Sequence, residues 1–199
     1  MSLQEILKST KKTIKTIRWF MISTIIFTII IGTILTIGIV FKTIEISSNS
    51  FAIGQLSIDL KEGVFITNPA FARFSIPYTI IHLCIYFVIY LLILKELDTI
   101  ISNALSSSIF NKDNTKSIRN IAIYILINGV LINIAKFIEC FRLNNYTDLN
   151  LLLNNAVVSS ININFKIELG YFILAYVIYI LSKIFDYGQE LQQLSDETL

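Results

Sequence analysis

The chain has 199 residues, of which 54% are hydrophobic and 15% are charged, and its formal net charge at pH 7 is +2. Average soluble chains are about 45–50% apolar and about 25% charged, so this composition excludes both an ordinary soluble domain and a disordered chain. The mean hydropathy of +0.70 instead favours a protein embedded in lipid. With two prolines and no low-complexity linker, we expect one integral membrane domain over residues 1–199.

The first predicted element is an amphipathic helix over residues 2–18. Apolar and basic residues alternate at helical spacing, which places them on opposite faces. The apolar face consists of Leu3, Ile6, Leu7, Ile14 and Ile17, and the basic face of Lys8, Lys11, Lys12, Lys15 and Arg18. We expect this helix to rest on anionic headgroups and to act as a topology signal, with binding of a partner as the alternative.

Four stretches with few or no charges predict transmembrane helices. The first, residues 19–41, contains 23 consecutive uncharged residues. As a helix it would be about 34 Å long, enough to cross a hydrocarbon core of ~30 Å. It is too long for a cleavable secretory signal, so we expect it to remain as an anchor. The predicted spans are residues 19–41, 74–94, 119–138 and 169–185.

The second predicted span contains a proline, and the fourth is shorter than a membrane-crossing helix usually is. Pro77 would lie in the first turn of the second span, where its missing N–H costs no intrahelical bond. The fourth span has only 14 uncharged residues, 169–182. It reaches membrane length only if Lys183 extends its charge to the headgroups.

The basic residues predict the orientation of the spans. Ten of the 16 Lys and Arg residues flank one side of the four predicted spans, and six flank the other. Because Lys and Arg are retained on the cytoplasmic side, both termini are expected in the cytoplasm. The connections 42–73 and 139–168 would then lie outside.

Both outer connections contain strand patterns. Phe51, Ile53, Ile58 and Leu60 precede a predicted turn at 61–63 and a further apolar run at 64–66, which predicts a β-hairpin. Residues 161–168 alternate strictly between apolar and polar side chains, a period of two. The predicted fold class is therefore an all-α membrane protein of four transmembrane helices with a small extracytoplasmic hairpin or sheet. That sheet would serve as a structural cap or as a ligand-sensing surface.

Small and hydroxylated residues recur every four positions in the first span, at Thr24, Thr28, Gly32 and Thr36. Such a stripe lets two helices approach closely, and it predicts a packing face. The partner helix could belong to the same chain or to a second copy, so a homo-oligomer stays open.

Four ionisable residues lie near the predicted outer boundary: His82, Lys136, Glu139 and Glu168. We interpret them as interfacial anchors and local ion pairs, with Lys136 and Glu139 on one helix face at spacing i,i+3. The alternative is a proton or cation path through His82 and Glu139.

Signatures of enzymatic chemistry are missing from the sequence. It has one histidine, and its two cysteines, Cys84 and Cys140, lie far apart, which favours neither a metal centre nor a disulfide. Neither a phosphate-binding loop nor a nucleophile-elbow motif occurs. We therefore expect no catalytic residue, no cofactor and no bound metal. The small net charge, with the basic residues at the span ends, also argues against direct binding of nucleic acid.

Residues 109–121 and 187–199 resemble the corresponding segments of a bacterial family, domain of unknown function 2975 (DUF2975). Its members are four-span membrane proteins with a Pro-Phe-x-x-x-Asn-like stretch before the third span and an ending of the type Gly-x-x-Leu-Gln-x-x-x-Asp-x-Thr-Val. Here Ile109 replaces the usual proline, and Gln193, Leu194 and Ser195 replace acidic residues. The resemblance implies a protein of the bacterial cytoplasmic membrane whose gene accompanies small helix-turn-helix regulators.

The same two segments are expected on the cytoplasmic face, where they could form one docking surface within residues 95–119 and 183–199. The alternative is helix capping plus an amphipathic extension of the last span. The candidate docking residues are Phe110, Asn111, Asn114, Arg119, Gly188, Leu191, Gln192 and Asp196.

Two functions follow from these patterns. The first is a regulatory or sensory membrane protein that engages a cytoplasmic helix-turn-helix regulator. The second is a small transporter, channel or self-protection protein, which the polar residues Asn128 and Asn133 in the third span would serve.

Overall fold

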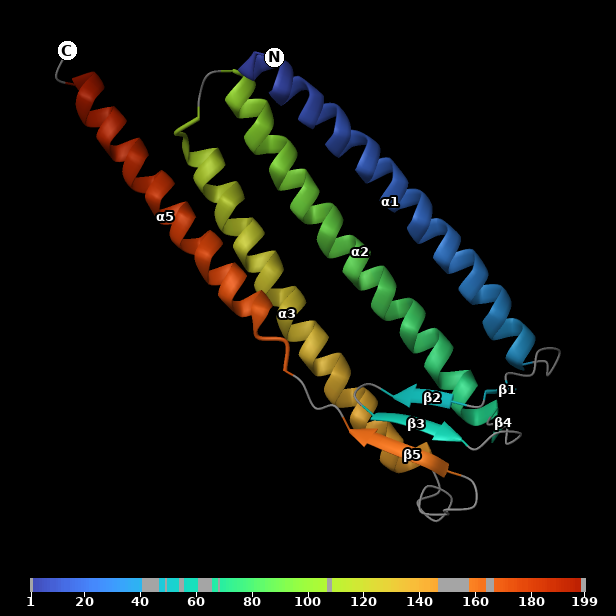
Figure 1. The fold of residues 1–199 in the computed structure, drawn as a ribbon. Helices are drawn as coiled ribbons and strands as arrows, with labels where there is room; N and C mark the ends of the chain where they lie inside the picture. Colours follow the sequence, from blue (N-terminus) through green and yellow to red (C-terminus); the bar gives the residue numbers. More distant parts are fainter. Residues whose placement is uncertain are drawn as a thin grey trace. The chain divides into compact units, whose positions relative to one another are not determined.

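Four long helices make up most of the computed structural model (Figure 1). It describes residues 2–40, 47–48, 50–53, 56–60, 66–67, 69–106, 109–146, 158–163 and 167–197. The helices are α1 (Leu3–Val40), α2 (Pro69–Leu105), α3 (Lys112–Tyr146) and α5 (Gly170–Glu197). Each contains a stretch long and apolar enough to cross a membrane. The protein therefore has the helices of a four-span membrane protein.

Helix α1 begins with a reciprocal cap. The Ser2 main-chain N–H donates to Glu5 Oε2 at 2.7 Å, and the Glu5 N–H donates to Ser2 Oγ at 3.3 Å. This exchange satisfies donors that the first turn of a helix leaves free. The amphipathic segment and the first span, expected as separate elements, form one continuous helix. Large apolar side chains such as Trp19 and Phe20 are 67% and 73% exposed, as suits a lipid-facing surface.

The other helices extend beyond the predicted spans. Helix α2 begins at Pro69, so the prediction that Pro77 lies in the first turn is wrong. Pro69 itself takes the first helical position, where a missing N–H is tolerated. Helix α3 starts seven residues before the predicted span, and α5 continues 12 residues past it. The predicted ends followed the charged residues, which mark the hydrocarbon boundary but do not interrupt a helical backbone.

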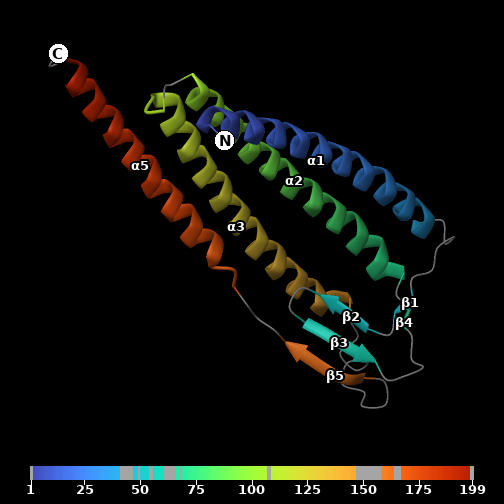
Figure 2. The ribbon, with the colours of Figure 1, turned by 45° about the horizontal axis from the view of Figure 1, so that its top comes forward.

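The chain divides into two compact units that share the helices. The first unit comprises Met1–Ile26, Ile85–Gly129 and Leu169–Leu199, and the second comprises Phe27–Cys84 and Val130–Glu168. In the first unit, α1 begins and α5 ends at the same end, which also carries the turn from α2 to α3 (Figures 1 and 2). Buried apolar residues of this unit come from all four helices, at Ile14, Ile89, Ile118, Ile121, Ala122 and Ala175.

The second unit also contains short strands. They are β1 (Ser47–Ser48), β2 (Ser50–Ile53), β3 (Leu56–Leu60), β4 (Ile66–Thr67) and β5 (Val158–Ile163). Strands β2, β3 and β5 form an antiparallel sheet in that order, and β1 pairs with β4. Phe51 lies opposite Ile58, which in turn lies opposite Ile161. Two connections far apart in the sequence thus meet at β3.

The strands differ in detail from the predicted hairpin. The expected turn at 61–63 lies outside the described residues, and Ile66 pairs with Ser48 of β1. Strand β2 pairs with β3 instead, with Ile53 opposite Leu56. Strand β5 ends at Ile163, and Glu168 has no strand conformation although it continues the alternating pattern. Residues 164–166 of the alternating pattern lie outside the described residues.

Candidate functional site

The two segments singled out by their sequence pattern are in contact in the first unit. A Cβ atom added to Gly188 would lie 2.9 Å from two ring carbons of Phe110, so the glycine allows the ring to approach α5. The Phe110 ring also packs against Phe185, with ring centroids 5.3 Å apart and planes tilted by 42°. This is within the range of favourable aromatic pairs. We call Phe110, Phe185 and Gly188 the α3–α5 junction.

Asn114 holds the segment that carries Phe110. Its side chain is fully buried, its Nδ2 donates to the main-chain oxygen of Ile109 at 2.7 Å, and its Oδ1 accepts from Asn103 Nδ2 at 2.8 Å. Its main-chain N–H donates to Asn111 Oδ1 at 2.7 Å, which caps the start of α3. Asn114 therefore positions the α2–α3 turn from inside, whereas the sequence grouped it with surface docking residues.

Beyond the junction, the last turns of α5 present an apolar stripe to the outside. Tyr187, Leu191 and Leu194 are 61%, 49% and 60% exposed. Their spacing of i, i+4 and i+7 places them on one helix face. Most of the residues between them are polar, so this part of α5 is amphipathic. We call these three residues the α5 stripe.

The remaining candidate docking residues have different settings. Arg119 and Gln192 are exposed, and Asn111 is half-buried because it caps α3. Asp196 lies within α5, but its side chain is outside the described part. The structure thus brings Phe110 and Gly188 into contact and leaves Leu191 in the neighbouring stripe.

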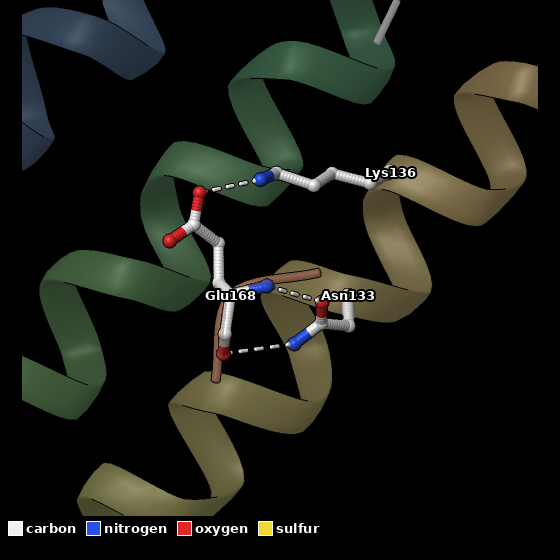
Figure 3. A network of polar contacts seen from close by, with 3 residues as sticks. All are labelled: Asn133, Lys136 and Glu168. Atoms are coloured by element: carbon white, nitrogen blue, oxygen red, sulfur yellow. Dashed lines mark hydrogen bonds and ion pairs between the residues drawn. The ribbon is translucent and has the colours of Figure 1, made fainter. Parts of the chain in front are cut away.

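A second polar cluster lies in the second unit and joins α3 to the residue two positions before α5 (Figure 3). Asn133 Oδ1 accepts from the Glu168 main-chain N–H at 3.0 Å, and Asn133 Nδ2 donates to the Glu168 main-chain oxygen at 3.4 Å. Lys136 Nζ lies 2.8 Å from Glu168 Oε1. These contacts hold the main chain in place just before α5 begins. The side-chain amide of Asn133 makes both hydrogen bonds to the main chain.

Three of the ionisable residues predicted near the outer boundary have described contacts in this unit. Lys136 pairs with Glu168, while the side chain of Glu139 lies outside the described residues. His82 stacks on Tyr78 with ring centroids 5.9 Å apart, and the Tyr78 hydroxyl donates to the main-chain oxygen of Ala135 at 3.3 Å. The Tyr78 hydroxyl thus joins α2 to α3.

Asn128 has a different environment from Asn133. It is 3% exposed, and its Oδ1 has no hydrogen-bond partner among the described residues. The next residue, Gly129, lies against Tyr171 of α5, where an added Cβ would come within 2.6 Å of the Tyr171 Cβ. A buried amide oxygen without a partner is costly in a helix interface, so Asn128 is a candidate for interaction with something outside this chain.

In the small-residue stripe of α1, the glycine is the residue that allows α2 to approach closely. An added Cβ at Gly32 would lie 2.7 Å from Cγ1 of Ile80 on α2, so the close approach occurs within one chain. The Thr24 and Thr36 hydroxyls donate to the main-chain oxygens of Phe20 and Gly32 on their own helix, at 2.9 and 2.7 Å. Thr28 lines an apolar groove of about 420 Å³ beside Gly32.

The part of the chain that the structure describes has no group of three or more His, Cys, Asp or Glu side chains that could hold a metal ion. Its described free thiol, Cys84, is half-buried in α2.

Comparison with known proteins assigns the family. Residues 66–199 match the family described as protein of unknown function (DUF2975). The chain belongs to this family. No curated protein and no solved structure matches the chain. The DUF2975 match includes α2, α3 and α5 and both segments of the α3–α5 junction.

Sequence reasoning missed three residues of this DUF2975 chain that the structure brings into the site. Asn103 and Phe185 lie within apolar or helix-forming stretches, and nothing in their local pattern indicates a distant partner. Asp98 also escaped notice, although it faces the basic side of α1 and lies 3.8 Å from the Arg18 guanidinium. Two acidic residues, Glu96 and Asp98, follow the predicted span, and this is a signal that could have identified a partner for the basic segment.

Proposed function

We propose that this DUF2975 protein is a non-enzymatic regulatory protein of the bacterial cytoplasmic membrane that docks a small helix-turn-helix regulator at the α3–α5 junction. The observation that carries the proposal is the contact of Phe110 with Phe185 and Gly188. It joins the two family motifs into one surface, next to the α5 stripe.

The α5 stripe provides the chemistry of recognition. Three exposed apolar side chains at i, i+4 and i+7 are the anchors with which an amphipathic helix enters an apolar groove of a partner. Burying one leucine side chain contributes about 1.5–3 kcal/mol. Leu191 and Leu194 together would then account for a large part of a micromolar affinity, which is about 8 kcal/mol.

The proposed orientation places both termini and the α2–α3 turn in the cytoplasm and the small sheet outside, where it would receive the stimulus. The excess of Lys and Arg at the ends of the spans supports this orientation. The common end at which α1 begins, α5 ends and α2 turns into α3 supports placing these three parts on one side of the membrane (Figure 1).

Labelling of Cys140 tests the orientation. In a Cys84→Ser background, a membrane-impermeant thiol reagent added to intact cells is expected to label Cys140 from outside. Labelling that requires opened cells would reverse the topology and remove the α5 stripe from the cytoplasm.

Co-purification tests the docking itself. The adjacent genes are searched for a small helix-turn-helix regulator, which is co-expressed with the full chain, and the chain is then purified in a mild detergent. Leu191→Glu with Leu194→Glu is expected to reduce capture at least tenfold, because two charges would enter the apolar contact. The matched control, Gln189→Glu with Gln193→Glu, adds the same charges on another side of α5 and is expected to retain capture. Absence of capture by the wild type, with unchanged transcription after gene deletion, would refute the proposal.

Transport or self-protection is the second candidate, and one observation favours it. The buried Oδ1 of Asn128, which has no hydrogen-bond partner in the part of the chain that the structure describes, could bind a transported solute or ion. Asn128→Leu would abolish uptake or survival in that case, while capture of the regulator would be unchanged. A docking protein is expected to behave in the opposite way, with no dependence on Asn128.

A further inference from the structure

A basic cavity of about 540 Å³ lies beside the N-terminal part of α1 in the first unit. Four lysines and one arginine of α1 line it, together with one carboxylate of α2. These residues are Lys8, Lys11, Lys12, Lys15, Arg18 and Asp98. The cavity faces the basic side of α1, which the sequence predicted to rest on anionic headgroups and to act as a topology signal, without a defined binding site.

The charges in this cavity are unbalanced. Five positive side chains meet one carboxylate, which leaves a net charge of +4. Arg18 Nη1 lies 3.8 Å from Asp98 Oδ2, so the arginine is the member of the cluster that has an anionic neighbour. No described carboxylate is recorded within ion-pair distance of the four lysines. The cavity therefore attracts an anion, and most strongly on its lysine side, away from Asp98.

The far end of the cavity is apolar. Trp19 and Ile22 line it at positions i+4 and i+7 from Lys15, on the same side of α1. They lie at the start of the uncharged run that forms the first span, and Trp19 is 67% exposed. Tryptophan prefers the level of the lipid headgroups. A ligand that fills this cavity would thus carry its negative charge at one end and its hydrocarbon at the other.

We propose that the cavity binds the phosphate headgroup of an anionic phospholipid. The four lysines hold the phosphate, and the acyl chains leave past Trp19 and Ile22 along the lipid-facing side of α1. Basic pockets beside membrane helices are known to take such headgroups. The carboxylate of Asp98 bounds the site and limits its affinity, because it opposes the charge of the phosphate. The site does not depend on docking of a regulator.

Lipid retention measures the binding. The full chain is purified in mild detergent, mixed with phosphatidylglycerol or phosphatidylcholine, and examined by native mass spectrometry at low and high salt. Retention of phosphatidylglycerol over phosphatidylcholine is expected, with a loss of that preference as salt screens the lysines. Equal retention of the two lipids would overturn the proposal.

Charge-neutralising variants locate the site. A cationic side chain near the headgroups contributes about fivefold in affinity, so Lys11→Gln with Lys15→Gln is expected to weaken phosphatidylglycerol binding by roughly 25-fold. The matched control is Lys112→Gln with Lys116→Gln, which removes two exposed charges of α3 that do not line the cavity. An equal loss in both pairs would show diffuse attraction and would refute a defined site.

A variant that binds the lipid more tightly shows that changes in binding do not come from misfolding. Asp98→Asn removes the opposing charge and releases Arg18, so binding of phosphatidylglycerol is expected to increase up to fivefold. A decrease or no change would contradict the proposed role of Asp98. Inorganic phosphate and a polyglutamate peptide serve as competitors. Displacement of the lipid by millimolar phosphate would assign a free anion to the cavity. Displacement by the peptide would assign an acidic protein segment. Either result would overturn the lipid assignment.

Discussion

Replacement of Asn114 by alanine tests the internal support of the α3–α5 junction. The side chain is fully buried and bridges the end of α2 to the residues before α3. Asn114→Ala removes the donor to the Ile109 main-chain oxygen and the acceptor for Asn103 Nδ2. It leaves the main-chain N–H of residue 114 bonded to Asn111, so the cap of α3 persists.

The two lost hydrogen bonds are worth about 1–3 kcal/mol together. The vacated side-chain volume adds about 1 kcal/mol, since neighbours fill a small cavity only partly. We expect a total loss of about 2–4 kcal/mol in the free energy of unfolding. Asn111→Ala, which removes the cap of α3, is expected to cost about 1 kcal/mol.

Unfolding of the full chain in mixed micelles, with increasing sodium dodecyl sulfate and circular dichroism as the signal, measures these differences. A double-mutant cycle of Asn103→Ala with Asn114→Ala should give a coupling energy of about 1 kcal/mol, because the two side chains share one bond. The reasoning is refuted if Asn114→Ala costs less than 1 kcal/mol, or less than Asn111→Ala.

Gly32→Ala is expected to destabilise the chain by about 1–3 kcal/mol through overpacking against α2. Gly170→Ala, with nothing within 4 Å of the new Cβ, is its matched control and should be within about 0.5 kcal/mol of the wild type in the same unfolding assay. Asn128→Leu should leave stability unchanged or raise it by about 1 kcal/mol, since an unpaired buried oxygen is removed; a large loss would mean that Oδ1 has a partner. Lys136→Gln should cost at most about 1 kcal/mol, because Lys136 and Glu168 are 27% and 39% exposed, and a loss above 2 kcal/mol would indicate a far stronger pair.

The long uncharged runs determined the number and approximate position of the helices. A run of 23 residues without a charge has few stable alternatives to a lipid-crossing helix, because its backbone must satisfy its own hydrogen bonds there. The ends of these helices were not determined in this way. Leu3 and Leu105 lie far outside the predicted spans, since a charged side chain leaves the hydrocarbon without ending the helix.

The partners of the polar residues were decided only by the tertiary structure. Sequence spacing gave no indication that Glu168 would lie beside Lys136, but the packed chain brings Glu168 to Lys136 and its main chain to Asn133 (Figure 3). Likewise, the pattern around Asn114 indicates a helix start but not burial beside Asn103. Hydropathy and periodicity are local properties of the chain. Which amide or carboxylate faces which depends on the rotation and depth of each helix in the bundle, and these follow from contacts between residues distant in sequence.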